Sequence, residues 1–111
     1  MRLCLGQGGL VACEIVWAEV TASFGSSEDA RKALERLRVE FSPTQAAAAA
    51  TAGMVFRDYR RRGGERGRVV ADFLIGAHAL EQADRLLTRD RGFYRTCFSG
   101  LSVLDPAAPA G

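Results

Sequence analysis

The 111-residue sequence lacks the features that mark membrane proteins, disulfide-rich secreted proteins and zinc proteins. No apolar run reaches the roughly 18 residues that span a bilayer. Three widely spaced cysteines, Cys4, Cys13 and Cys97, and a lone histidine, His78, predict neither a disulfide framework nor a zinc site. We therefore expect reduced, buried thiols in a cytoplasmic protein, with no membrane partner.

Positive charge is unevenly distributed, although the net charge is only +2. Lys32 is the only lysine, and the segment from residue 57 to 68 holds a cluster of arginines: Arg57, Arg60, Arg61, Arg62, Arg66 and Arg68. Arginine makes forked contacts to phosphate, which favours RNA binding. Two other interpretations stay open, because arginine usage follows genomic base composition and positive charge also stabilises a helix end.

The pattern of apolar residues predicts short strands that alternate with helices. We expect strands at residues 10–12, 39–41, 85–88 and 101–104, with helices between them and the most apolar helix at residues 69–82. This order is typical of an α/β fold, a parallel sheet with helices on both faces. One domain should cover residues 1–105, followed by a flexible tail at residues 106–111.

Three acidic residues stand where charge is costly or where strands end. Asp72 lies in an apolar run, Glu19 on a mainly apolar helix, and Asp90 just beyond a predicted strand. A buried carboxylate costs several kcal/mol unless it is paired or binds a metal. Singly, each has an ordinary explanation: a helix cap, a polar stripe and a turn residue paired to a neighbouring arginine. Together they indicate a site for a hard divalent cation.

Three segments carry a family resemblance. Residues 10–20, 71–79 and 86–93 read LVACEIVWAEV, ADFLIGAHA and LLTRDRGF. In this order they resemble the second, third and fourth acidic motifs of the PIN-domain family, and its VapC-like toxin ribonucleases in particular. The likeness extends from about residue 3 to residue 104.

The resemblance implies a ribonuclease of a toxin–antitoxin system that cleaves RNA phosphodiester bonds with carboxylate-bound Mg²⁺ or Mn²⁺. Glu19, Asp72 and Asp90 would be its catalytic metal ligands. Thr88 would orient a ligand or a water, although a strand-end hydroxyl bonded to backbone is an equal alternative. The partners implied are RNA, a cognate antitoxin and a second copy of the chain. His78 is expected in the core or facing a partner.

The sequence also departs from the family pattern. The family begins with a central strand that ends in Asp-x-Ser or Asp-x-Asn. Here Leu3 and Leu5 could end a helix or alternate in a short strand, and beside the family pattern residues 1–9 resemble the end of the helix before the second strand. We therefore expect a chain truncated at its N-terminus, without the first strand and one active-site acid. This favours a second hypothesis, an inactive PIN-like remnant that acts as an interaction or dimerisation module. An unrelated ligand-binding α/β fold is less favoured, because residues 6–9 lack the flanking strand and lysine of a phosphate loop.

Overall fold

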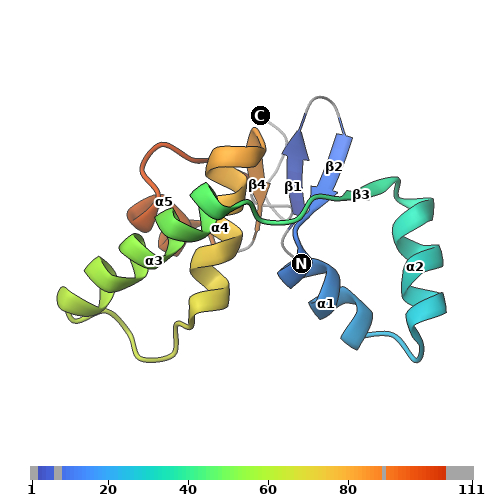
Figure 1. The fold of residues 1–111 in the computed structure, drawn as a ribbon, viewed down its shortest axis with the longest axis horizontal. Coiled ribbons are helices and arrows are strands. Elements are labelled where there is room, and N and C mark those ends of the chain that lie inside the picture. Colours follow the sequence, from blue (N-terminus) through green and yellow to red (C-terminus); the bar gives the residue numbers. More distant parts are fainter. Residues whose placement is uncertain (1–2, 7–8, 89, 105–111) are drawn as a thin grey trace.

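The computed structural model describes residues 3–6, 9–88 and 90–104 (Figure 1), so the predicted flexible tail lies outside the described residues. The elements, in chain order, are β1 (Leu3–Gly6), β2 (Gly9–Ala12), α1 (Glu14–Ala22), α2 (Ser27–Arg36), β3 (Val39–Phe41), α3 (Ala46–Arg61), α4 (Val70–Gln82), β4 (Arg85–Leu87), α5 (Arg91–Cys97) and β5 (Ser102–Leu104).

The strands form one sheet in the order β3-β2-β1-β4-β5. Strand β2 is parallel to β3, and β4 is parallel to β5. Strand β1 lies between these pairs and is antiparallel to both neighbours. The predicted helix-flanked α/β class is therefore confirmed, and the sheet is mixed because of its central strand.

Strand β1 corrects the expectation for the start of the chain. Residues 3–6 are extended rather than helical, and Cys4 pairs with Val11 on one side and Leu86 on the other. Leu3 and Cys4 are both buried. The antiparallel register pairs Gly6 with Gly9. The middle of the sheet is thus filled, although by a strand that runs opposite to β2 and β4 and carries no acid.

Helix α4 supplies much of the core and contacts β1, β4, α1 and α3. Its buried side chains include Phe73 and Ile75, which confirms the prediction of a helix covered on most faces. In Figure 1, α3 and α4 lie to one side of the strands, and α1 and α2 lie to the other. Helix α4 therefore fixes the position of Asp72 relative to the sheet.

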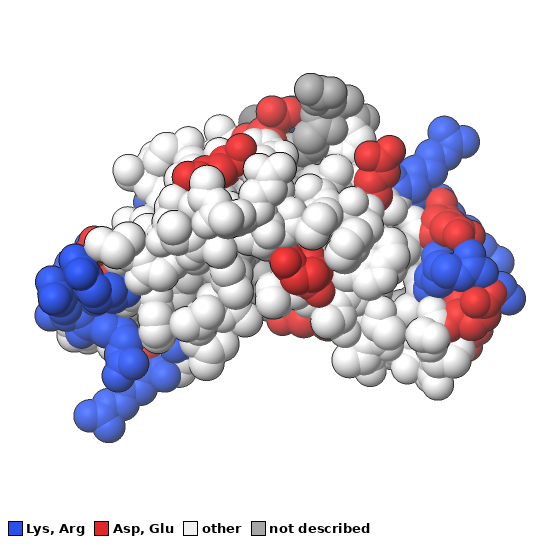
Figure 2. Space-filling view, viewed as in Figure 1, with Lys and Arg blue, Asp and Glu red and all other residues white. Residues whose placement is uncertain are grey.

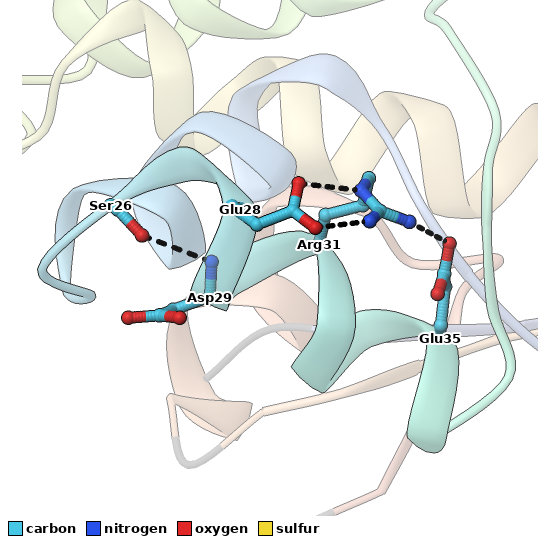
Figure 3. Close-up of polar contacts among 5 residues, drawn as sticks. All are labelled: Ser26, Glu28, Asp29, Arg31 and Glu35. Atoms are coloured by element: carbon cyan, nitrogen blue, oxygen red, sulfur yellow. Dashed lines mark hydrogen bonds and ion pairs between the residues drawn. The ribbon is translucent and has the colours of Figure 1, made fainter.

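Helix α2 is a surface helix that begins after a serine cap, Ser26. Ser26 Oγ accepts a hydrogen bond from the Asp29 amide at 3.1 Å. Arg31 lies between the carboxylates of Glu28 and Glu35 and pairs with both (Figure 3). These exposed contacts stabilise the helix locally and lie outside the site described next.

Candidate metal and nucleic-acid site

Asp72 lies in the first turn of α4 and is half-buried. Its Oδ2 accepts a hydrogen bond from the backbone N–H of Val69 at 3.0 Å. The Asp72 amide in turn donates to the Val69 carbonyl at 3.0 Å. The carboxylate thus satisfies an N–H at the start of the helix, where the helix dipole also favours negative charge. The helix-cap interpretation of Asp72 is confirmed.

Asp90 lies between β4 and α5, just beyond the carboxyl end of β4, as predicted. Its backbone N–H donates to Thr88 Oγ1 at 3.1 Å. The Thr88 side chain is 1% exposed, and its own amide donates to the Leu104 carbonyl at 2.8 Å. Thr88 therefore fixes the backbone that carries Asp90, which is the strand-end role considered for it.

Arg68 connects the two acidic segments. Its Nη1 lies 2.5 Å from Asp90 Oδ2, and its guanidinium carbon lies 3.9 Å from the centre of the Phe93 ring. The hydrogen bond to Asp90 raises the pKa of Arg68, and the charges of Asp90 and Asp72 act in the same direction. Both aspartates therefore act electrostatically on one guanidinium. The sequence did not single out this pairing, because residues 68 and 90 are remote along the chain.

Glu19, the third predicted ligand, is exposed on the second turn of α1. Within the described ranges, no set of three acidic, histidine or cysteine side chains lies close enough to hold a metal ion. The structure thus joins Asp90 to Arg68 and Asp72 to the adjacent Val69, and the three predicted acids do not form one group. The role of Glu19 as a ligand stays a prediction.

The clustered arginines surround clefts beside this pair. Five of the six are exposed, and Arg68 is half-buried. Figure 2 shows basic side chains gathered over the outer end of α3 and the loop that follows it. One cleft of about 470 Å³ lies between this loop and α5, and its lining includes Tyr59, Arg62, Arg68 and Phe93. Positive charge and aromatic rings thus occur together, a combination found in grooves that bind single-stranded nucleic acid.

A cluster of aromatic side chains packs next to the arginines. Phe73 is fully buried and contacts three rings, with centroid distances of 5.0 Å to Phe56, 5.3 Å to Tyr59 and 5.3 Å to Phe93. Tyr59 Oη also accepts a hydrogen bond from the Glu65 amide at 2.8 Å. This packing ties the arginine-bearing loop to the core and so fixes the clefts.

A second polar cluster lies between α4, β1 and the segment after β3. His78 is fully buried; its Nε2 lies 3.1 Å from Ser42 Oγ and its Nδ1 lies 3.7 Å from Cys4 Sγ. Burial lowers the pKa of His78 and raises that of Cys4 to about 12. The thiol therefore stays protonated, and the cluster is structural rather than nucleophilic. This confirms the prediction of a core histidine; Cys4 and Cys13 are buried free thiols as predicted, whereas Cys97 is only half-buried.

Glu14 is half-buried and contacts Thr44, an interaction that the sequence did not reveal. Its carboxylate accepts hydrogen bonds from the Thr44 amide at 3.0 and 3.1 Å and from the Thr44 hydroxyl at 2.5 Å. Partial burial raises the pKa of Glu14, but these hydrogen bonds outweigh it, and the net shift is downward. The contact joins the start of α1 to the segment before α3, and the alternation of apolar residues carries no signal for it.

The fold and its acidic edge define a helix-flanked α/β domain with carboxylates beyond a strand end and at a helix start. A family model described as PIN domain matches residues 2–99. The chain therefore belongs to the PIN domain family.

A solved structure, the VapBC2 complex of Rickettsia felis bound to a DNA fragment from their promoter, has a similar fold. The TM-score is 0.67 and the sequence identity 23%, and the alignment covers 89% of this chain and 76% of that chain. At this identity the likeness establishes the fold. A search of curated proteins found no match. Among the described residues, no helix is both long and apolar enough to cross a membrane.

Proposed function

We propose that this PIN domain is a metal-dependent ribonuclease of a toxin–antitoxin system. One observation carries the proposal: Arg68 pairs with Asp90 beside an arginine-lined cleft, and the adjacent Val69 donates its N–H to the Asp72 carboxylate. Carboxylates suit a hard divalent cation, and the arginines nearby suit an RNA backbone. The substrate proposed is therefore RNA, and the bond cleaved is its phosphodiester.

The acid pair fits Mg²⁺ by its chemistry. Mg²⁺ is usually held by one or two carboxylates, while waters and substrate phosphates complete its shell, so a third protein ligand is not obligatory. When bound, such an ion supplies an activated water and stabilises charge in the transition state. Asp72 and Asp90 would hold it, Mn²⁺ could replace it, and Glu19 is the proposed further ligand. Thr88 would position Asp90 through the Asp90 amide.

The proposed partners follow from the same role. The similar structure from Rickettsia felis is of VapBC2, and by analogy we propose an antitoxin partner for this chain. A homodimer is a further part of the proposal. The three cysteines are free thiols, which fits the reducing cytoplasm.

The alternative is an inactive PIN domain that acts as an interaction module. Its support is that no three-ligand group occurs in the parts of the chain that the structure describes. The two functions differ in what a substitution at the acids should do. A ribonuclease loses its chemistry, whereas an interaction module keeps its binding to protein partners.

The test is RNA cleavage by the full chain with Mg²⁺, with Mn²⁺ and with chelator. We expect Asp90→Asn and Asp72→Asn each to lower the rate by more than about a hundredfold, because even groups that only orient metal ligands cost ten- to a hundredfold. Asp58→Asn, an exposed acid on α3 beside Arg57, is the matched control and should change little. Cleavage that persists in chelator, or in Asp90→Asn, would contradict the proposal.

A further inference from the structure

Arg68 lies at the junction of the two acidic segments. It belongs to the loop between α3 and α4, two residues before α4 begins, while Asp90 lies between β4 and α5. The Arg68 side chain is 24% exposed and that of Asp90 is 45% exposed, so the ion pair is in contact with solvent. The guanidinium is also stacked on Phe93, which holds it in one orientation. A cation supplied by the chain itself thus sits on a carboxylate that the proposed function assigns to a metal.

We propose that Arg68 is an internal counter-ion that competes with a divalent cation for Asp90. The inference rests on the proposed function, because it gives Asp90 a metal to bind. In this structure, Arg68 holds Asp90 Oδ2 and so offsets the negative charge of that carboxylate. For Asp90 Oδ2 to bind a divalent cation, the Arg68 guanidinium must leave this oxygen, because two cations at one oxygen repel each other. Metal affinity is therefore set partly by the strength of the Arg68–Asp90 pair.

Two features make this exchange feasible. A partly exposed ion pair is weak, so a doubly charged ion with favourable coordination can displace it. The Arg68 side chain, once released from Asp90, can also bind a second group. Arg68 lines the 470 Å³ cleft together with Arg62, so its charge becomes available to a phosphate there. Cation binding at the acids and anion binding in the cleft would then be coupled through one residue.

The first experiment measures Mn²⁺ binding by titration calorimetry and electron paramagnetic resonance. It compares the full parent chain with Arg68→Ala, Arg60→Ala and Asp90→Asn. We expect Arg68→Ala to bind Mn²⁺ about two- to fivefold more tightly, the range that a partly exposed ion pair implies. Arg60 is a matched control, since it is an arginine of the same cluster that lies over an aromatic ring, 5.6 Å from the centre of Phe56. Arg60→Ala should change the affinity less, and Asp90→Asn should weaken it strongly.

The second experiment is a double-mutant cycle on stability. Denaturant melts of the parent, Arg68→Ala, Asp90→Asn and the double variant give the coupling between the two side chains. We expect the coupling to be measurable in chelator and to shrink in saturating Mn²⁺, when Asp90 has left Arg68. Coupling that is absent in chelator, or unchanged by Mn²⁺, would overturn the inference.

The outcomes separate the two proposals. If Arg68→Ala leaves Mn²⁺ affinity unchanged or weaker, while Asp90→Asn abolishes both Mn²⁺ binding and RNA cleavage, the counter-ion inference fails and the ribonuclease stands. If Arg68→Ala tightens Mn²⁺ binding but the parent and the variant leave RNA intact, the inference stands and the proposed function fails. If no variant binds Mn²⁺, both fail.

Discussion

Asp72 combines a structural contact with a place beside the candidate site. Its carboxylate accepts the Val69 amide and lies in the first turn of α4, where negative charge is favourable. Its apolar neighbours, such as Phe73 and Ile75, point into the core while Asp72 itself is only half-buried. The Asp72→Asn variant therefore needs a check of its folding, because a weakened helix start typically costs about 1 kcal/mol.

His78 is the residue through which mild acid should destabilise the fold. Burial lowers its pKa from the ordinary 6.5, and its neighbours are Cys4, Ser42 and the charge of Glu14, which acts more weakly in the opposite direction. The unfolded chain takes up a proton near pH 6.5, whereas the folded chain does so only at lower pH. Stability is therefore full above pH 6.5 and falls as the pH drops towards the folded pKa, by at most about 1.4 kcal/mol per pH unit.

Urea melts between pH 7.5 and 5 provide the measurement. The parent should lose stability across this range, and His78→Gln should flatten the dependence even though it is less stable throughout. Glu14 does not confuse the result, because its pKa is lowered from 4.5, below the range used. An equal slope in His78→Gln and the parent would assign the effect to other groups.

At the scale of elements, the helices and strands reflect their local sequence closely. The apolar run from residue 69 predicts α4, Ser26 marks the start of α2, and the short strands at residues 39–41 and 85–87 lie where expected. These features follow from side-chain periodicity and capping, which act over a few residues. Residues 3–6 differ, because a strand of four residues is defined by its partners more than by its own pattern.

Two glycines inside helices should respond in opposite ways to alanine. A Cβ at Gly76 in α4 would lie 2.4 Å from the ring of Phe98, which is itself 2% exposed and cannot move aside easily. We expect Gly76→Ala to destabilise the fold by about 1–3 kcal/mol, despite the gain in helix propensity. A Cβ at Gly53 in α3 would meet no atom within 4 Å. Gly53→Ala should therefore stabilise the fold by up to about 1 kcal/mol.

Thermal or denaturant melts of the two variants beside the parent test this contrast. Each variant is a control for the other, since both substitutions add one methyl group to a glycine within a helix. Equal effects of the two substitutions would mean that Phe98 does not pack against Gly76 as described.

For the whole molecule, the direction of β1 has a consequence for the site. Leu3 pairs with Leu87, the last residue of β4. The first residue of β1 therefore lies beside the carboxyl end of β4, just before Asp90. Because β1 is antiparallel to β4, its carboxyl end lies beside the amino end of β4. The family resemblance implies a first strand that delivers an acid at its carboxyl end. Among the described residues, β1 fills the central place of the sheet and delivers no acid at its carboxyl end.

Hydrogen exchange tests whether β1 is part of the cooperative core. Because β1 is paired on both sides, we expect the amides of residues 3–6 to exchange only on global unfolding, with a free energy close to that from denaturant melts. Strand β3 at the edge of the sheet is the internal control and should exchange more readily. Exchange at Cys4 as fast as in the loop at residues 63–68 would contradict the central position of β1.

The sequence by itself determined the α/β class, most element positions, the core histidine and the identity of the candidate acids. These depend on periodicity, capping and the cost of buried charge, which are readable within a short segment. Only the tertiary structure decided the direction of β1, the Arg68–Asp90 pair and the Glu14–Thr44 contact. Each joins residues remote along the chain, and their meeting is set by how α4 and the strands pack. No local pattern encodes that packing, because it is the result of all the apolar surfaces being buried together.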